Sequence, residues 1–215
     1  MGLFVELNWD KYTKGKSVCI IGAASSLLDN EQAEAINSYD IVARVNWGWP
    51  ISDKVASYTG SRCDVLYMGD GTLTGWLKNP EYFNRADMDW IVAVRCTVGG
   101  EKHLAFTKQL NGVAFRITGR PYEKIIKRII GTLPNSGHLA ITDLLSTGLR
   151  ELYVTGFDFY SSGVYEGYGS NDKSRPTVPN GVGPRHDQRK HLAAFRRLCE
   201  LDKRIKVDGT LRGML

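Results

Sequence analysis

The stretch that decides the fold runs from Pro134 to Tyr160 and reads PNSGHLAITDLLSTGLRELYVTGFDFY. It contains in order a turn, a helix, a second turn and a short strand that ends in Gly-Phe-Asp-Phe-Tyr. A polar, flexible cluster opens the helix, and an acid and a tyrosine close the strand. We expect both polar ends to face the same bound ligand.

The rest of the chain repeats this alternation of short apolar runs and helical patterns. Strands are expected at 17–22, 40–46, 63–69, 89–95, 112–118, 151–156 and 204–207. Further helices are expected at 25–36, 53–60, 101–110, 121–131 and 187–201. This order is typical of an α/β layer fold with a mostly parallel sheet flanked by helices. No repeat or linker divides the chain, so a single domain over residues 1–215 is predicted.

One connection in this pattern is unusually long. Residues 161–184 form a polar, glycine-rich segment, longer than most connections in compact domains. The segment carries Tyr165 and Tyr168. We interpret it as a lid over the ligand.

Composition and charge exclude several classes of protein. Hydrophobic residues make up 42% of the chain, and no run approaches the roughly 20 apolar residues that span a bilayer. The start lacks the apolar core of a secretory signal, so we expect a cytoplasmic protein. The four cysteines lie far apart without C-x-x-C spacing, which favours free thiols over a zinc site. The net charge of +5, concentrated near the C-terminus, suits an anionic substrate, a membrane surface or nucleic acid, or simply a solvated helix face.

The carboxyl ends of the expected strands indicate which residues are candidates for a binding site. In open α/β sheets, ligands bind beyond the carboxyl ends of the strands. The polar or small residues predicted to share this rim are Gly22 and Ser25 after the first strand, Arg44 and Asn46 ending the second, residues 69–71, and Gly156, Asp158 and Tyr160. The N–H groups of the turn at 22–26 could hold a phosphate, although the turn lacks G-x-G-x-x-G spacing and resembles any tight strand-to-helix turn.

Two other patterns contain residue types that could carry out chemistry. Asp87 and Asp89 spell D-x-D, a metal-binding pattern in many sugar transferases, but they precede a strand and therefore belong to the opposite edge of the sheet. We interpret them as a solvated turn. His138, His186 and His191 lie near helix starts, where the helix dipole favours the neutral, basic imidazole. A lone histidine is also compatible with a surface or packing role, and without G-x-S-x-G a hydrolase triad has no support.

Read together, these segments resemble the sialyltransferases. CIIGAASSLL followed by INSYDIVARVN is similar to the family's large sialylmotif, and PNSGHLAITDLL followed by LYVTGFDFY is similar to its small sialylmotif. GFDFYSSGVY and YTGSRCDVLY look like segments of the bacterial lipooligosaccharide sialyltransferases. The resemblance extends from about residue 16 to residue 207, and it implies a modified Rossmann-like sheet of the GT-A type.

The resemblance also implies roles for individual residues. Asn46 and the turn at Gly22 should hold the nucleotide, and Asn135, Ser136 and Gly137 should contact cytidine or its ribose. Tyr160 and Tyr165 should hydrogen-bond the leaving phosphate, and His186 should be the general base on the acceptor hydroxyl. The implied reaction transfers sialic acid from CMP-sialic acid with inversion, and it needs neither a metal nor a cofactor.

Departures from the family pattern leave alternatives open. Ala23 stands where the family usually has Asn after the glycine, and the small motif lacks the cysteine of the animal enzymes. With the missing membrane anchor, we expect a version from a bacterium or a virus-infected cell, either cytoplasmic or peripheral to a membrane. The alternatives are a UDP-sugar transferase that acts on a hydroxylated DNA base or another glycan, and a nucleotide- or nucleic-acid-binding module without turnover. A glycan acceptor is favoured over DNA because the basic residues after Arg185 are spread over more than one helix face without interleaved aromatics.

Overall fold

The computed structural model describes residues 2–84, 86–95, 100–159, 161–166, 168 and 186–215. Within them, seven strands form one sheet in the order β5-β4-β3-β2-β1-β6-β7, and every neighbouring pair is parallel. The strands are β1 (Ser17–Ile21), β2 (Ile41–Val45), β3 (Val65–Met68), β4 (Trp90–Ala93), β5 (Ala114–Ile117), β6 (Glu151–Thr155) and β7 (Ile205–Val207). The predicted α/β class with a parallel sheet is confirmed.

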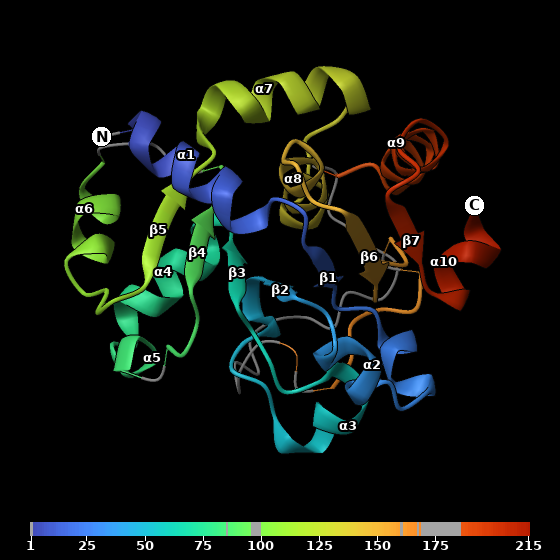
Figure 1. Ribbon diagram of the computed structural model, residues 1–215, viewed down its shortest axis with the longest axis horizontal. Helices are drawn as coiled ribbons and strands as arrows, with labels where there is room; N and C mark the ends of the chain where they lie inside the picture. Colours follow the sequence, from blue (N-terminus) through green and yellow to red (C-terminus); the bar gives the residue numbers. More distant parts are fainter. Residues whose placement is uncertain (1, 85, 96–99, 160, 167, 169–185) are drawn as a thin grey trace.

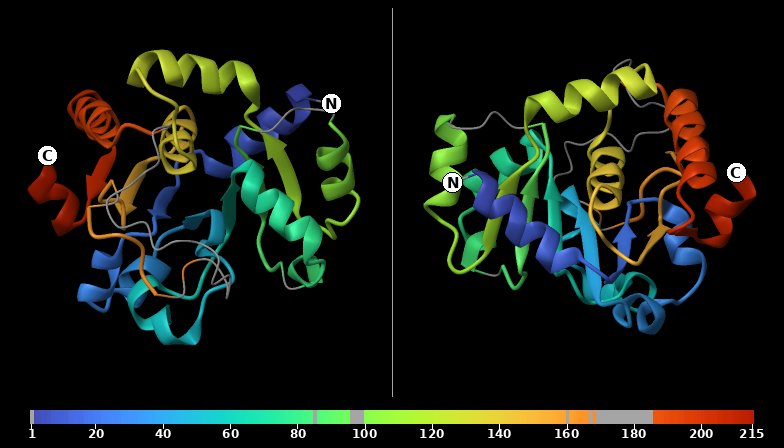
Figure 2. Two further views of the ribbon diagram at one scale, coloured as in Figure 1. Left: turned by 180° about the vertical axis from the view of Figure 1, so that it is seen from behind. Right: turned by 45° about the horizontal axis from the view of Figure 1, so that its top comes forward.

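Helices cover both faces of this sheet, so the fold has three layers (Figures 1 and 2). One face packs against α1 (Gly2–Thr13), α7 (Gly119–Ile130), α8 (Ser136–Leu145), α9 (Gln188–Leu201) and α10 (Gly209–Met214). The other carries α2 (Ala33–Asn37), α3 (Ala56–Thr59), α4 (Asp70–Lys78), α5 (Glu81–Asn84) and α6 (Glu101–Thr107), with the 3-10 turns η1 (Ser25–Asp29), η2 (Asn46–Gly48) and η3 (Asp53–Val55). No helix of the described residues is long and apolar enough to cross a membrane.

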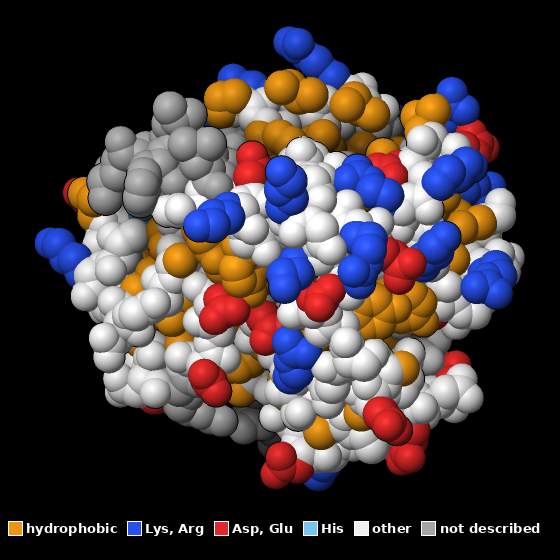
Figure 3. Space-filling view, viewed as in Figure 1, with side chains coloured by type: hydrophobic (Ala, Val, Ile, Leu, Met, Phe, Trp, Pro, Cys, Tyr) orange, Lys and Arg blue, Asp and Glu red, His pale blue; other side chains and the backbone are white. Residues whose placement is uncertain are grey.

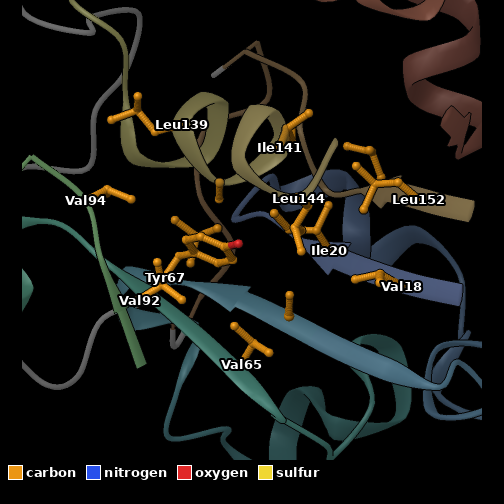
Figure 4. Packing of buried hydrophobic residues seen from close by; sticks show 14 of the residues in the cluster. Val18, Ile20, Val65, Tyr67, Val92, Val94, Leu139, Ile141, Leu144 and Leu152 are labelled. Atoms are coloured by element: carbon orange, nitrogen blue, oxygen red, sulfur yellow. The ribbon is translucent and has the colours of Figure 1, made fainter. Parts of the chain in front are cut away.

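The central strands are buried on both faces, which explains their nearly continuous apolar sequences. In β1, Val18 and Ile20 face the core beneath α8, and Cys19 and Ile21 face the opposite cluster. Leu144 of α8 belongs to the same cluster as Val18 and Ile20 and lies between the helix and the sheet (Figure 4). This packing fixes α8 over the middle of the sheet, with its first turn at the carboxyl edge.

A buried polar network fastens α8 to two strands. The Tyr67 hydroxyl donates to Asp143 Oδ2 at 2.8 Å, and Arg116 Nη1 lies 2.8 Å from each carboxylate oxygen of Asp143. The guanidinium of Arg116 also lies 5.4 Å from the centre of the Trp9 ring of α1. A carboxylate removed from water is stable only when paired in this way. The network therefore joins α1, α8, β3 and β5.

The helices differ from expectation in several places. The single helix expected at 25–36 is divided into η1 and α2. Four helices were not expected: α1, α4, α5 and α10. In α4, a Cβ on Gly75 would lie 2.5 Å from the Trp47 ring, so packing requires glycine at this position. Because glycine is a poor helix former, it weakens the sequence pattern by which this helix could be predicted.

The predicted lid at 161–184 lies largely outside the described residues. Of this segment, residues 161–166 and 168 are described, and Val164 forms an antiparallel bridge with Ala24. The described part of the segment therefore pairs with the turn that follows β1.

Candidate functional site at the carboxyl edge of the sheet

The turns after β1 and β6 meet at the carboxyl edge. Strand order reverses between these two neighbours, because the chain proceeds from β1 through β2 to β5 and then returns to the other side of β1. Gly22 N donates to Thr155 O at 2.8 Å, and Ala24 N donates to Gly156 O at 2.9 Å. A Cβ on Gly22 would lie 2.1 Å from Gly156 O, so only glycine permits this approach. Such a switch point is where open α/β sheets bind ligands.

Two predicted donor-binding residues brace the segment beyond this turn. Ser25 Oγ donates to Ser162 O at 2.7 Å. Asp158 is buried, and its Oδ2 accepts from Ser162 N at 2.5 Å. Both side chains thus hold the segment after β6 against the turn after β1, and their predicted contact with a donor stays a prediction.

A second cluster surrounds Asn46 at the end of β2. Its Oδ1 accepts from Gly69 N at 2.8 Å and from Thr72 Oγ1 at 3.2 Å. Within the described chain, its Nδ2 group makes no hydrogen bond and is available to a ligand. A Cβ on Gly69 would lie 2.8 Å from Ser136 Oγ and 3.5 Å from Arg95 Nη2. Asn46 after β2, the backbone at Gly69 after β3 and Arg95 after β4 therefore converge on the first turn of α8.

Arg95 is a candidate that the sequence analysis missed. It follows β4, its backbone φ is 62°, and its Nη1 donates to Pro134 O at 3.4 Å. Its Nε is buried and has no partner among the described residues. A guanidinium beside Ser136 is suited to a carboxylate or phosphate. The available signal was a basic residue that ends the apolar run WIVAV at a strand's carboxyl end.

The start of α8 has the geometry expected of a ligand-binding helix terminus. Asn135 is its N-cap, and its Oδ1 accepts from His138 N at 2.8 Å. Ser136 and Gly137 are buried, and a Cβ on Gly137 would lie 2.5 Å from Cε1 of Phe157. The first turn of α8 is thus pressed against the segment after β6, and its N–H groups face the edge where an anion would be stabilised.

Two histidines contact one carbonyl oxygen, that of Leu133. His186 Nδ1 lies 2.7 Å from Leu133 O, and His191 Nε2 lies 3.1 Å from the same atom. A carbonyl only accepts, so each of these nitrogens carries the proton. In the neutral ring, a proton on Nδ1 places the lone pair on Nε2, the nitrogen that a general base would use. The sequence placed His186 beside a helix start but could not show this tautomer.

The other two histidines are buried beneath His186. His138 Nδ1 lies 3.4 Å from His191 Nδ1. Because His191 carries its proton on Nε2, His138 is the donor in this contact. Burial lowers the pKa of His138 to about 3 and lowers that of His191 as well, so both are neutral at pH 7. They form a neutral, packed support for the Leu133 loop.

Two other predicted residues are more enclosed than expected. Tyr165 is 4% exposed and packs with Cys19 and Leu27, and burial raises the pKa of its hydroxyl. Arg44 is fully buried and donates to the carbonyl oxygens of Thr59, Gly60 and Arg62. It thus links β2 to the turn before β3, and its contact with a donor stays a prediction. Tyr160 lies outside the described residues.

A pocket of about 280 Å³ opens farther along the same edge. It lies at the starts of α4, α6 and α7, beyond the ends of β3, β4 and β5. Its lining carries both signs of charge and comprises Asp70, Leu73, Gly100, Glu101, Lys102, His103 and Arg120. Because Asp70 directly follows Gly69, the pocket adjoins the Asn46 cluster.

The D-x-D pair lies away from this edge. Asp87 and Asp89 are exposed and precede β4, and Asp89 Oδ2 accepts from the Tyr12 hydroxyl at 2.7 Å. Their placement before the strand agrees with the sequence analysis. Among the described residues, no group of three or more potential metal ligands is present.

Comparison with known proteins supports the fold at this point. No protein-family model and no curated protein matches the sequence. The sialyltransferase CstII from Campylobacter jejuni, solved with the substrate analogue CMP-3FNeuAc, has a TM-score of 0.60 and 16% identity over 89% of this chain and 81% of its own. A mammalian sialyltransferase, solved with Gal-beta-1-3GalNAc-ortho-nitrophenol, has a TM-score of 0.58 and 13% identity over 93% and 71%. The chain has a sialyltransferase-like fold.

A further structure of CstII, in complex with a trisaccharide acceptor and CMP, has a TM-score of 0.56 and 18% identity over 89% of this chain and 80% of its own. At these identities the likeness shows the architecture alone. The two sialylmotif resemblances therefore stay sequence-level resemblances, placed by the structure at the ends of β1, β2 and β6 and at the start of α8.

Proposed function

We propose that the chain is a metal-independent, inverting glycosyltransferase that moves sialic acid from CMP-sialic acid to an acceptor hydroxyl. The observation that carries the proposal is the fixed tautomer of His186 at the edge where the sialyltransferase-like fold would bind its donor. Its Nδ1 proton is held by Leu133 O, and Leu133 leads directly into the first turn of α8. The loop before α8 thus both contacts the proposed base and leads into the helix N-terminus.

The donor would lie along the carboxyl edge. Cytidine and its ribose would meet Asn135, Ser136 and Gly137, and the phosphate would lie near the start of α8, where helix N–H groups stabilise negative charge. The Nδ2 group of Asn46 and the turn at Gly22 would complete the cradle. This part of the proposal rests on the convergence of these residues and on the sequence resemblance.

The charge of Arg95 favours an acidic sugar. Sialic acid carries a carboxylate, and a guanidinium whose Nη2 borders Gly69 and Ser136 offers a cation for it. A UDP-hexose presents no carboxylate on its sugar. Arg95 therefore suits the CMP-sialic acid donor that we propose.

The reaction would consist of one proton transfer and one displacement at the anomeric carbon. His186 Nε2 would take the proton of the acceptor hydroxyl while that oxygen attacks the anomeric carbon from the face opposite the phosphate. The carbon–oxygen bond to phosphate breaks, and CMP leaves with the electron pair. The hydroxyl groups of Tyr160 and Tyr165 would donate hydrogen bonds to the leaving phosphate, and these bonds strengthen as charge develops.

The acceptor is proposed to be a glycan rather than a DNA base. Three exposed basic residues of α9 already have partners: Lys190 lies 4.0 Å from Asp187, Arg197 lies 2.7 Å from Glu200, and Arg196 donates to Met214 O. A phosphate backbone would have to compete with these contacts. The pocket at the starts of α4, α6 and α7 offers donors and acceptors of hydrogen bonds that suit sugar hydroxyls.

The test is a donor and acceptor screen with detection of released CMP or UDP. Wild-type protein should release CMP from CMP-sialic acid when a glycan acceptor is present. His186→Ala should lower turnover by about 10²–10⁴-fold, the usual contribution of a general base. CMP should still raise the melting temperature of this variant, and more than UDP does.

Arg150→Ala is the control, because Arg150 is exposed and directly precedes β6, at the edge of the sheet opposite the candidate site. It should keep its turnover. A His186→Ala enzyme that retains more than about a tenth of wild-type turnover would exclude the proposed base. Release of UDP but not CMP would favour the alternative donor, and ligand binding without release of either would favour a binding module.

A further inference from the structure

The outer face of α7 combines exposed isoleucines with unopposed positive charge. Ile125 and Ile129, one helical turn apart, are 55% and 70% exposed, whereas Ile126 and Ile130 pack into the core. Figure 3 shows hydrophobic side chains along α7 at the top of the molecule, with Lys or Arg side chains beside them. Isoleucine is seldom left this open on a solvated helix, so two together indicate contact with something apolar.

The charges on this face all have one sign. Lys124, Lys127 and Arg128 are exposed, and within the described part of the chain none of them makes an ion pair. The helix has one acid, Glu123, which is buried and lies 3.4 Å from Arg120. The outer face of α7 therefore presents two isoleucines within a basic surface.

We propose that this face of α7 binds the surface of an anionic membrane, with Ile125 and Ile129 entering the headgroup boundary. An interfacial helix has this composition, with aliphatic residues on the contact face and Lys or Arg around them. A second copy of the chain is a poor occupant, because two such faces would bring like charges together. A nucleic acid would use the charges but would leave the isoleucines in water.

The position of α7 connects this surface to the candidate site. The helix joins the carboxyl end of β5 to the loop before α8, and Lys190 Nζ of α9 donates to Gly131 O at 3.2 Å at its end. Both ends of α7 therefore adjoin the carboxyl edge of the sheet. A bilayer bound along α7 would lie beside that edge, but the binding itself does not depend on the proposed reaction.

The test is cosedimentation with vesicles of phosphatidylcholine alone or mixed with phosphatidylglycerol. Wild-type protein should bind the mixed vesicles and not the neutral ones. Each Lys or Arg near an anionic surface strengthens binding by about fivefold, so K124Q/K127Q/R128Q should weaken it by about a hundredfold. I125S/I129S should also release the protein, because its apolar contact is lost.

Matched control variants remove the same kinds of side chain, basic and aliphatic, at positions outside α7. K54Q/K78Q/K108Q changes three exposed lysines outside α7 and leaves the same net charge as the α7 triple variant, and L201S removes a leucine that is 66% exposed on α9. Both should bind like wild type, and thermal unfolding should show that all variants fold. Absence of wild-type binding, or equal loss in the control triple, would overturn the proposal. So would a wild-type dimer that I125S/I129S dissociates, or binding to duplex DNA without binding to vesicles.

Discussion

The buried histidine pair makes stability depend on pH in a range where few other groups titrate. Burial lowers the pKa of His138 from 6.5 to about 3. Below pH 6.5 the unfolded chain gains a proton at this position, while the folded chain does not until about pH 3. The stabilising contribution is therefore complete above pH 6.5 and is lost progressively as the pH falls toward 3.

The size of the effect follows from the shift. Each pH unit between the two pKa values changes the free energy of unfolding by about 1.4 kcal/mol, so lowering the pH from 7 to 5 should remove about 2 kcal/mol. This is a large part of a total stability of about 5–15 kcal/mol. For a chain of this length it corresponds to a fall in melting temperature of about 4–8 °C.

The assay is urea denaturation of the wild type and of His138→Gln at pH 7 and pH 5. Glutamine does not titrate, so the free energy of unfolding of the variant should change much less between pH 7 and pH 5 than that of the wild type. The change that remains comes from His191, whose pKa burial also lowers. Asp40, whose pKa the hydrogen bonds from Ser17 lower, loses its contribution only below pH 3.8. If His138→Gln is as sensitive to pH as the wild type, the burial argument is wrong.

Asp143→Ala should lower the free energy of unfolding by about 3–5 kcal/mol, because Arg116 would lose a buried carboxylate; chemical denaturation measures this, and a loss below about 1 kcal/mol would contradict the network's role. Tyr165→Phe should lower kcat more than it raises the KM for the donor, whereas a change in KM alone would indicate a packing residue. Turnover should survive excess EDTA and the double change Asp87→Ala with Asp89→Ala. Loss that Mg²⁺ or Mn²⁺ restores would revive the D-x-D site.

The sheet and the position of its carboxyl edge could be predicted because their signals are local. The strand at 17–22 is a run of buried apolar residues, and the helix after Asn135 begins with a cap whose hydrogen bond to His138 N is present in the structure. Parallel strands bring their carboxyl ends to one edge whatever their order along the chain. Periodicity therefore placed Asn46 at this edge and capping placed Ser136 at a helix start, whereas the roles of Ser136 and His186 beside the donor came from the family resemblance.

The remainder depended on contacts that no local pattern contains. Gly22 must be glycine because its backbone approaches Gly156, a residue more than a hundred positions away. The local sequence indicated only a turn whose N–H groups could hold a phosphate. Arg95 looked like the end of a strand because its neighbours Gly69 and Ser136 come from other elements. The assignment of the His186 proton likewise required the position of Leu133 O. Each of these is a contact between residues that are far apart in the sequence. A local pattern can point to one of the two residues but not to its partner.

Backbone strain gives an independent reason to place function at the carboxyl edge. Among the described residues, the non-glycine residues with positive φ are Asn46 at 52°, Arg95 at 62° and Phe159 at 53°. Each follows a different strand at that edge, and such conformations cost of order 1–3 kcal/mol each. Glycine would adopt them without this cost, so stability alone does not explain an amide and a guanidinium there. The strain fits a requirement for those two side chains, aimed at Gly69 and the start of α8, where the proposed donor would lie.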